Sequence, residues 1–176
     1  VFSWWKFNFK KIIFNQGPGS GLILRKVQKL RLQNAQERIW IQNPYFAPIR
    51  PIFDLLIQKA KQGVDVRIIV PHKNDIFFMK WISYYYFRKL IQSGILVFEY
   101  LPVFSHQKII QVDAQAFLGS INFNHRSFLY DHEIEVRIED PANRKSLEER
   151  FLEAFLNFLR LLNNDVSASR EAPITS

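Results

Sequence analysis

Apolar residues recur along this chain with two different periods, and these periods distinguish helices from strands. Spacings of three and four residues predict helices over 22–36, about 52–62, 75–92 and from Pro141 to about Leu162. Alternating positions and short apolar runs predict strands over 38–42, 66–70, 95–100, 108–112, 116–122 and 133–138. Because strands alternate with helices, the sequence predicts an α/β fold with a mixed, mostly parallel sheet flanked by helices.

Local signals indicate the faces and ends of several elements. Ile23, Val27 and Leu30 fall on one side of the first helix, which predicts its buried face. Gly63 predicts the end of the second helix. The uninterrupted apolar run 66–70 is typical of a strand that is buried on both faces of a parallel sheet.

The last helix has a recognisable start. Asp140 is suited to the N-cap position, and Pro141 fits the first helical position. Apolar residues at helical spacing are predicted to face the core, namely Leu147, Phe151, Phe155, Phe158 and Leu162. From Asn163 onward the chain is polar and is predicted to form a loose tail.

Two predicted strands between residues 106 and 122 carry four polar side chains at spacings of two. His106 and Lys108 are two apart, as are Ser120 and Asn122, and residues two apart on a strand point to the same face. A three-residue turn over 113–115 would form a β-hairpin that pairs Lys108 with Ser120 and His106 with Asn122. An imidazole, an ammonium, a hydroxyl and a carboxamide would then share one patch, which is suited to hold a phosphate and attack it.

Charge and aromatic content favour an anionic partner. The formal net charge of +8 suits phospholipid headgroups, a membrane surface or nucleic acid. The high aromatic content, 15% with 17 Phe, indicates a surface suited to lipid. There is no Cys, which excludes a disulfide framework and a thiolate metal site. No run reaches the roughly 18 apolar residues needed to span a bilayer, although the basic, aromatic N-terminal segment is suited to a membrane surface or to packing against further protein.

The polar pattern of the hairpin is similar to the HKD signature of the phospholipase D superfamily. The residues that carry the resemblance are His106-x-Lys108-x4-Asp113, then Gly119-Ser120-x-Asn122, Arg126-Ser127 and Glu133. Upstream, the segments 43–48 and 63–71 and Asp75 are similar to the second half of bacterial cardiolipin synthases, so the resemblance covers roughly residues 22–160. The sequence departs from the family twice: the spacing from Asp113 to Gly119 is one residue short, and Asn124 stands where relatives usually carry Asp.

The resemblance implies a role for each polar residue of the hairpin. His106 would attack the phosphorus and form a covalent phosphohistidine. Lys108 and Asn122 would bind the non-bridging oxygens, and Ser120 would add a hydrogen bond. Glu133 would accept a proton from the far ring nitrogen of His106 and so fix its tautomer.

Asp113 is interpreted as a structural residue of the motif, and the other histidines are assigned no role in catalysis. Asp113 falls in the turn, on the opposite parity from the four polar residues of the hairpin. His72 has no partner at ligand spacing, and His125 and His132 fall in an irregular segment near Asp131 and Glu133, so no metal site is assigned to them. Phosphoryl transfer through a phosphohistidine needs no metal, and no cofactor is implied. The aromatic residues of 77–87 cover more than one helical face, so part of them is expected in the core and part against lipid or a partner domain.

A single HKD motif supplies a nucleophile but no general acid on the opposite side of the phosphorus. Relatives solve this with two motifs, in one long chain or across a homodimer. The start of the chain is similar to the closing helix of a first half-domain. The resemblance therefore implies the C-terminal half of a two-motif enzyme, with a homodimer as the alternative.

The implied function is phosphatidyl transfer of the cardiolipin-synthase type. A phosphatidyl group would pass from phosphatidylglycerol through His106 to a second lipid or an alcohol, at the surface of the bacterial inner membrane. Two alternatives stay open: a homodimeric HKD nuclease, to which the charge of +8 is also suited, and a non-catalytic half-domain. The predicted organisation is a basic-aromatic segment with a Gly-Pro linker over 1–21, a phospholipase D-like domain over 22–163 and a polar tail over 164–176.

Overall fold

The computed structural model describes residues 12–16, 21–72, 77–100 and 105–170. Within these residues, the centre of the molecule is a seven-stranded sheet in the order β1-β7-β6-β5-β2-β3-β4. The strands are β1 (Ile12–Gln16), β2 (Arg38–Gln42), β3 (Asp65–Pro71), β4 (Leu96–Tyr100), β5 (Ile109–Val112), β6 (Gln115–Gly119) and β7 (His132–Ile138).

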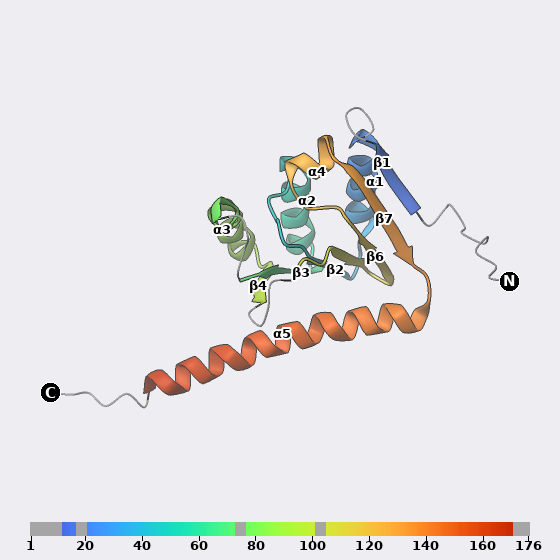
Figure 1. Cartoon of the computed structure of the whole chain (residues 1–176). Coiled ribbons are helices and arrows are strands. Elements are labelled where there is room, and N and C mark those ends of the chain that lie inside the picture. Colours follow the sequence, from blue (N-terminus) through green and yellow to red (C-terminus); the bar gives the residue numbers. More distant parts are fainter. Residues whose placement is uncertain (1–11, 17–20, 73–76, 101–104, 171–176) are drawn as a thin grey trace.

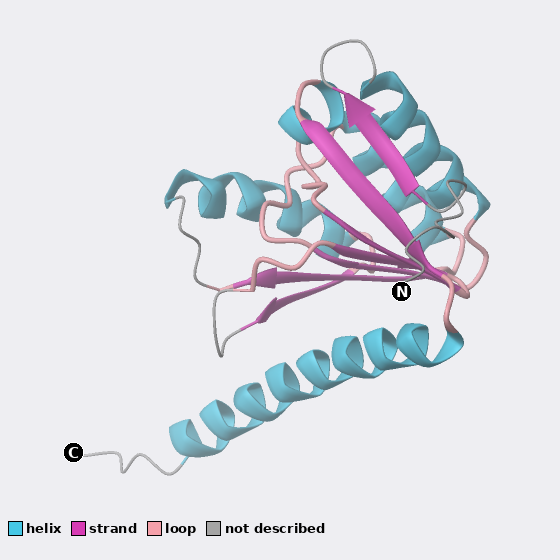
Figure 2. Ribbon diagram, turned by 45° about the vertical axis from the view of Figure 1, so that its right-hand side comes forward, coloured by secondary structure: helices cyan, strands magenta, loops and turns pink. Residues whose placement is uncertain are grey.

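Helices cover both faces of the sheet. They are α1 (Gly21–Asn34), α2 (Arg50–Lys61), α3 (Phe77–Gln92), α4 (His125–Leu129) and α5 (Pro141–Arg170). The helices α1, α2 and α4 lie together over one face, with α3 near the β4 edge (Figure 1). The long helix α5 runs along the opposite face, as both views show (Figure 2).

The sheet has an antiparallel part and a parallel part. The pairs β1–β7, β7–β6, β6–β5 and β5–β2 are antiparallel, whereas β2–β3 and β3–β4 are parallel. The predicted α/β class and the mixed sheet flanked by helices are confirmed, but the expectation of a mostly parallel sheet is wrong. Parallel pairing is confined to β2, β3 and β4, which are connected through the crossover helices α2 and α3, whereas β5 and β6 share a tight turn that requires antiparallel pairing.

The strand β3, which lies between β2 and the edge strand β4, is buried on both faces, as its apolar run predicts. Ile68 belongs to the main core under α1 and α2, whereas Ile69 belongs to a second cluster with Trp40, Phe98 and Phe151. The rings of Trp40 and Phe151 stack with centroids 5.0 Å apart. Since Phe151 lies on α5, this aromatic contact attaches the long helix to its face of the sheet.

The predicted end of α2 and the predicted start of α5 are confirmed. Gly63 follows α2 with a φ of 90°, the left-handed conformation that glycine adopts without strain. The carboxylate of Asp140 accepts a hydrogen bond from the N–H of Asn143 at 2.8 Å, which is the N-cap interaction predicted for α5.

The predicted end of α5 is wrong. The helix continues through 163–170 to Arg170, where the sequence predicts a loose tail. No Gly or Pro interrupts the chain between Leu162 and Pro173, so nothing in this stretch forces the helix to stop. The side chains of Phe158 and Leu162, which are predicted to face the core, lie outside the described part of the helix.

The buried face of α1 also differs from the prediction. Leu30 is 47% exposed, and among the described side chains of the helix the buried ones are Leu24, Gln28 and Leu32. Val27 is half-buried, and the side chain of Ile23 lies outside the described residues. Gln28 reaches the core side because its amide donates a 2.7 Å hydrogen bond to the buried carboxylate of Glu135 on β7. A polar residue thus occupies a position that the hydrophobic pattern assigns to the solvent.

The helix α3 divides its aromatic side chains between core and solvent, as expected. Phe87 is buried, whereas Tyr84 is half-exposed and Tyr85 is 64% exposed. The side chains of Phe77 and Phe78 lie outside the described residues. Tyr85 and its neighbours therefore present a partly apolar surface beside β4.

The strand β1 is not among the predicted elements. Residues 1–21 are expected to lie outside the domain, yet Ile12–Gln16 extends the sheet by pairing with β7. Ile12 lies opposite Val136, and Gln16 lies opposite His132. The proposed likeness of the chain start to a closing helix is thus wrong for residues 12–16. A five-residue strand whose partner lies so far along the chain leaves no local signal of its pairing.

The hairpin β5–β6 has a register one residue away from the predicted one. Val112 lies opposite Gln115 and Gln111 lies opposite Ala116, so the loop contains two residues and not three. The predicted pairing of Lys108 with Ser120 is therefore wrong. The shorter loop is possible because Asp113 adopts a φ of 51°, a left-handed conformation that Asp tolerates better than most residues.

Asp113 binds the start of β2 from this turn. Its carboxylate accepts hydrogen bonds from the backbone N–H groups of Gln36, Glu37 and Arg38, at 3.1, 2.8 and 3.1 Å. Burial raises the pKa of Asp113, but these three donors and the charge of Lys59 outweigh it and hold the pKa below its ordinary value. The aspartate of the motif thus attaches the hairpin to β2 at the end remote from His106.

We expect Asp113→Ala to lower the free energy of unfolding by about 1–3 kcal/mol, because three N–H groups lose their acceptor and Ala is strained at positive φ. Asp113→Asn keeps one acceptor oxygen and the tolerance for positive φ, so its loss is smaller. A depressed carboxyl pKa gives stability that is complete above about pH 4–5 and disappears as the pH falls through the folded pKa. The difference in free energy of unfolding between wild type and Asp113→Asn should therefore become smaller from pH 7 to pH 3, as measured by urea unfolding. A difference that grows toward acid pH would contradict this role.

Candidate active site

The candidate site lies at the edge of the sheet where β2 and β3 end and β5 begins. Gln42, the last residue of β2, lies opposite both Ile109 of β5 and Ile69 of β3. Residues that follow β2 and β3 or precede β5 therefore gather at one edge, and these include Asn43, His72, His106 and Lys108. Ligands of open α/β sheets commonly bind beyond the carboxyl ends of parallel strands, which is where this edge lies.

His106 and Lys108 lie side by side. The ammonium of Lys108 is 2.8 Å from Nδ1 of His106 and donates to the His106 carbonyl oxygen at 3.1 Å. The two side chains thus lie on the same side of the chain, as their spacing predicts. The ring of Tyr45 stands edge-on to the imidazole, with centroids 5.6 Å apart. An ammonium held against an exposed imidazole is suited to bind the same anionic group that the imidazole meets.

Ser120 and Glu133 form a second polar pair. The hydroxyl of Ser120 donates to the buried carboxylate of Glu133 and accepts from the N–H of Ile134 at 3.0 Å. The N–H of Ser120 donates to the carbonyl oxygen of Ile134 at 2.9 Å, so the residue is attached to β7 by its backbone as well. A Cβ on the preceding Gly119 would overlap that same carbonyl oxygen, which explains the glycine of the Gly-Ser pair.

The contact of Glu133 differs from the expectation. The sequence resemblance places its carboxylate on the far nitrogen of His106, whereas the structure places it on Ser120 and puts Lys108 beside Nδ1. The shorter hairpin loop accounts for part of this difference, because the shifted register carries Ser120 past the end of β6 and against β7.

Asn122 has an unusual environment. Its N–H donates weakly to the hydroxyl of Ser127 at 3.3 Å. Within the described residues, its Oδ1 is the one buried side-chain polar atom that has no hydrogen-bond partner. A buried carboxamide oxygen without a partner costs free energy and is rare in folded proteins, so we expect a ligand to supply the missing hydrogen bond. Rotating the carboxamide by 180° would exchange its oxygen and nitrogen and present the NH₂ donors in the same place.

Asn43 positions Asn122 from both sides. Its side-chain amide donates to the carbonyl oxygen of Ile121 at 3.0 Å and accepts from the N–H of Phe123 at 3.2 Å. It also accepts from the N–H of Tyr45 at 3.3 Å, so one buried side chain connects the neighbours of Asn122 with the residue that touches His106. Asn43 is not among the predicted site residues, although an Asn-Pro pair after a buried strand could have indicated it.

The second departure from the family pattern, Asn in place of Asp at position 124, is explained by the start of α4. Asn124 is the N-cap of α4, and its side-chain oxygen accepts from the N–H of Ser127 at 2.9 Å. Asn and Asp are both strong N-cap residues, because each presents an oxygen to the first turn. The exchange of Asp for Asn at this position therefore keeps the cap.

The other three histidines belong neither to the His106–Lys108 pair nor to the Ser120–Glu133 pair. Nδ1 of His72 is 2.5 Å from the carboxylate of Glu99, which also accepts from the hydroxyl of Tyr84 at 2.8 Å. Burial, and then the hydrogen bond to Glu99, raise the pKa of Tyr84 to about 12. His125 and His132 are exposed. In the described part of the chain, no three His, Cys, Asp or Glu side chains are grouped to hold a metal ion.

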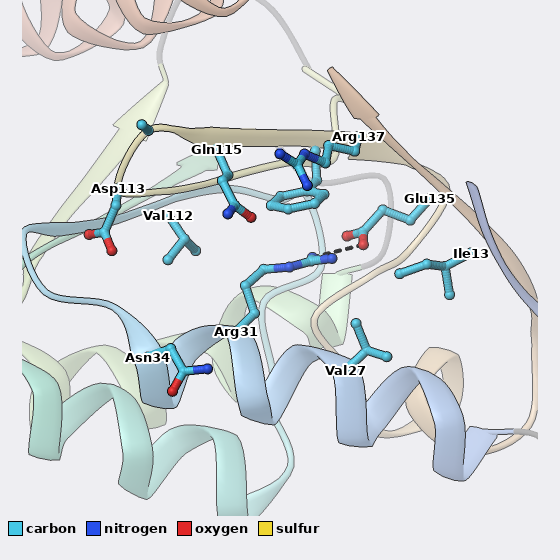
Figure 3. Close-up of a pocket in the computed structure, with 11 residues that line it drawn as sticks. Ile13, Val27, Arg31, Asn34, Val112, Asp113, Gln115, Glu135 and Arg137 are labelled. Carbon is cyan, nitrogen blue, oxygen red and sulfur yellow. Dashed lines mark hydrogen bonds and ion pairs between the residues drawn. The ribbon is translucent and has the colours of Figure 1, made fainter. Parts of the chain in front are cut away.

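A cavity of about 440 Å³ lies at the opposite end of the sheet, between α1 and the hairpin turn (Figure 3). Its lining includes the buried ion pair of Arg31 and Glu135, in which the guanidinium of Arg31 is 2.8 Å from Glu135 and 3.3 Å from the centre of the Phe117 ring. Burial lowers the pKa of Arg31 despite the attraction of Glu135. Because this cation is already paired and stacked, the contacts of Arg31 are structural, and this cavity is remote from His106.

The sequence matches the family described as "Cardiolipin synthase, PLD-like domain" over residues 29–155, which is most of the chain. The chain belongs to this family. The resemblance found in residues 106–133 is thereby confirmed at the level of the family. In this cardiolipin synthase-type domain, the matched region includes all of the strands β2 to β7.

Cardiolipin synthases of several bacteria are similar to the domain. The probable cardiolipin synthase YwiE of Bacillus subtilis is 39% identical over 123 residues, which are 69% of this chain and 25% of the relative. A cardiolipin synthase of Clostridium perfringens is 36% identical over 121 residues, or 68% of this chain and 25% of the relative. The matched part of the chain thus spans about a quarter of the length of these curated relatives.

Solved structures show the same fold. The phospholipase D family member Nuc from Salmonella typhimurium aligns with a TM-score of 0.69 at 21% identity, covering 82% of this chain and 92% of Nuc. A phosphatidylserine synthase from Haemophilus influenzae aligns with a TM-score of 0.62 at 22% identity, covering 84% of this chain and 38% of that chain. The described part of the cardiolipin synthase-type chain contains no helix long and apolar enough to cross a membrane.

We expect Asn43→Ala to lower the free energy of unfolding by about 2–4 kcal/mol, because the change leaves buried donors and an acceptor around Asn122 without partners. Asn34→Ala, at an exposed position on α1, is the matched control and should stay within about 0.5 kcal/mol of wild type. Urea unfolding measures both changes, and the backbone NMR signals of 121–123 should shift in Asn43→Ala alone. Unchanged signals there would show that Asn43 does not position Asn122.

Proposed function

We propose that this chain carries one half of the active site of a phosphatidyltransferase of the cardiolipin-synthase type. The observation that carries the proposal is the 2.8 Å contact between Lys108 and His106, which joins a nucleophile and a cation at the edge of the sheet. The unpaired carboxamide end of Asn122 supports it, since this group needs a ligand to complete its hydrogen bonding.

The reaction takes place in two displacements at phosphorus. In the first, a ring nitrogen of His106 attacks the phosphate of phosphatidylglycerol, a P–N bond forms, and the bond to the glycerol oxygen breaks. The leaving oxygen takes a proton from a general acid. In the second displacement, the hydroxyl of another phosphatidylglycerol returns a proton to that group and attacks, which breaks the P–N bond and restores His106.

Lys108 and Asn122 stabilise the charge that accumulates on the non-bridging oxygens. In this proposal Ser120 and Glu133 act as a unit, in which the buried carboxylate holds the hydroxyl and the segment that leads to Asn122. Glu133 thus acts on the site through Ser120, and Asp113 contributes by fixing the hairpin on β2.

The general acid comes from a second HKD half, because one His106 cannot stand on both sides of the phosphorus. That half is supplied in cis by a longer chain or in trans by a homodimer. A chain matching a quarter of its relatives' length is consistent with the first arrangement. The substrate is an anionic phospholipid, and the protein works as a peripheral protein at the bacterial inner membrane.

A nuclease is the second candidate, since the net charge of +8 suits a polyanionic substrate as well as an anionic membrane. Both candidates use the same displacement at phosphorus. Product formation from phosphatidylglycerol vesicles, measured beside cleavage of single-stranded and duplex DNA, separates them. DNA cleavage without any lipid product would favour the nuclease.

His106→Ala is expected to abolish turnover and the phosphoenzyme trapped by denaturation at neutral to alkaline pH, because the covalent P–N bond, which acid would hydrolyse, forms on that imidazole. Lys108→Gln should keep some phosphoenzyme but lower kcat/KM by about 10²–10³-fold, the usual cost of one charge-stabilising group. His125→Ala and His132→Ala remove exposed imidazoles to which the proposal assigns no role, and they serve as matched controls. The assay uses phosphatidylglycerol labelled in the phosphate. A labelled protein that persists in His106→Ala would place the nucleophile elsewhere.

Turnover by the 176-residue chain should depend on its association. If two copies supply nucleophile and acid, specific activity falls on dilution in parallel with the dimer fraction measured by ultracentrifugation. If the chain needs a different first half, it is inactive alone and gains activity when that half is added. A monomer with full, concentration-independent activity would show that a residue of this chain supplies the acid.

A further inference from the structure

A polar groove runs beside His106 on the face of the sheet that α5 covers. Its volume is about 420 Å³, within the range of small-molecule sites. The end of β2 contributes Gln42 to its lining, the segment before β5 contributes His106 and Gln107, and α5 contributes Arg150, Glu153 and Asn157. None of the three α5 residues belongs to the HKD pattern.

The helical spacing of the α5 residues places them along one wall of the groove. Arg150, Glu153 and Asn157 are three and four residues apart, so they lie on neighbouring turns of one face. At 1.5 Å per residue, the first and last are about 10 Å apart along the helix. The wall is held against the sheet by the stacking of Phe151 on Trp40 and by the contact of Phe155 with Phe98, whose ring centroids are 4.5 Å apart.

The polar side chains of this wall have no partners among the described residues, unlike other charged residues near α5. Arg38 pairs with Glu148 at 2.5 Å, and Arg144 donates to the carbonyl oxygen of Ala114 at 2.8 Å. No hydrogen bond or ion pair joins Arg150, Glu153 or Asn157 to another described side chain. A cation, a carboxylate and a carboxamide therefore converge on a groove with their bonding capacity available to a ligand.

We propose that this groove binds the glycerol phosphate headgroup of the phospholipid that takes part in the reaction at His106. The assignment rests on the proposed function for its place in catalysis, but the binding itself depends only on the chemistry of the groove. Arg150 supplies the charge for a phosphodiester. Glu153 accepts hydrogen bonds from the headgroup hydroxyls, while Asn157 and Gln107 can donate to them or accept from them.

The lining set distinguishes this ligand from simpler ones. Inorganic phosphate would use Arg150 but meet the repulsion of Glu153, whereas a neutral polyol would use Glu153 and Asn157 but leave the cation without a partner. Only a molecule that joins an anionic phosphate to free hydroxyls uses the whole wall. Because His106 lines the same groove, such a headgroup lies next to the group that exchanges phosphatidyl with it.

The test is an NMR titration of the ¹⁵N-labelled 176-residue chain with glycerophosphoglycerol, the deacylated and water-soluble form of phosphatidylglycerol, which contains the headgroup. Saturable shifts are expected along 150–157 and at Gln107. Arg150→Gln should weaken the affinity about tenfold, the loss of one charge-assisted contact. Asn157→Leu should reduce the preference for glycerophosphoglycerol over inorganic phosphate about fivefold. Lys145→Gln is the matched control, since this exposed lysine of α5 lies outside the groove and pairs with Glu149.

Three outcomes would overturn the proposal: no saturable binding, binding that Arg150→Gln leaves unchanged, or shifts confined to Lys108 and Asn122 that vanish in His106→Ala. The proposed function can fail separately. If the groove binds glycerophosphoglycerol as described but no phosphoenzyme forms on His106, the headgroup site stands and the transfer chemistry is wrong. If the phosphoenzyme forms while the groove does not bind glycerophosphoglycerol, the transfer chemistry stands and the headgroup site is wrong.

Discussion

The antiparallel pairing of β2 with β5 is the contact on which the site depends, because it joins the parallel part of the sheet to the hairpin. Both ends of β2 are attached to the hairpin region by side chains. At its start, three N–H groups donate to Asp113, and beyond its end Asn43 bonds to the backbone on both sides of Asn122. The hairpin therefore cannot slide along β2 without breaking partly buried and buried hydrogen bonds, and His106 is held at a fixed height on the edge.

Elements with a strong local pattern could be predicted from the sequence, whereas features set by distant partners could not. The apolar run of β3 and the caps of α2 and α5 depend on neighbouring residues, and they are correct. The face of α1 depends on Gln28 reaching Glu135 across the core, which no helical periodicity reveals. The hairpin register depends on the backbone conformation of Asp113, and loops of two or three residues are both compatible with the same alternation.

The candidate site also contains some features that the local sequence predicts and others that depend on distant partners. The proximity of His106 and Lys108 follows from their spacing and could be predicted. The bond between Ser120 and Glu133 could not, because it depends on where β6 ends against β7. Asn43 and the α5 groove were missed for a related reason: their relevance comes from packing against the hairpin, and an amide or an arginine alone carries no signal of chemistry.

The pairing of β1 with β7 has a consequence for how the domain assembles. It joins the first described strand to the last, so the intervening domain forms one large loop that must be closed before this ladder gains any hydrogen bonds. The strand β1 is then expected to join the sheet late in folding and to leave it early on heating. Its departure would expose the outer edge of β7 with the half-exposed Ile134. An uncovered strand edge of this kind is a template for pairing with another chain, so newly made or partly melted molecules would be the ones that aggregate.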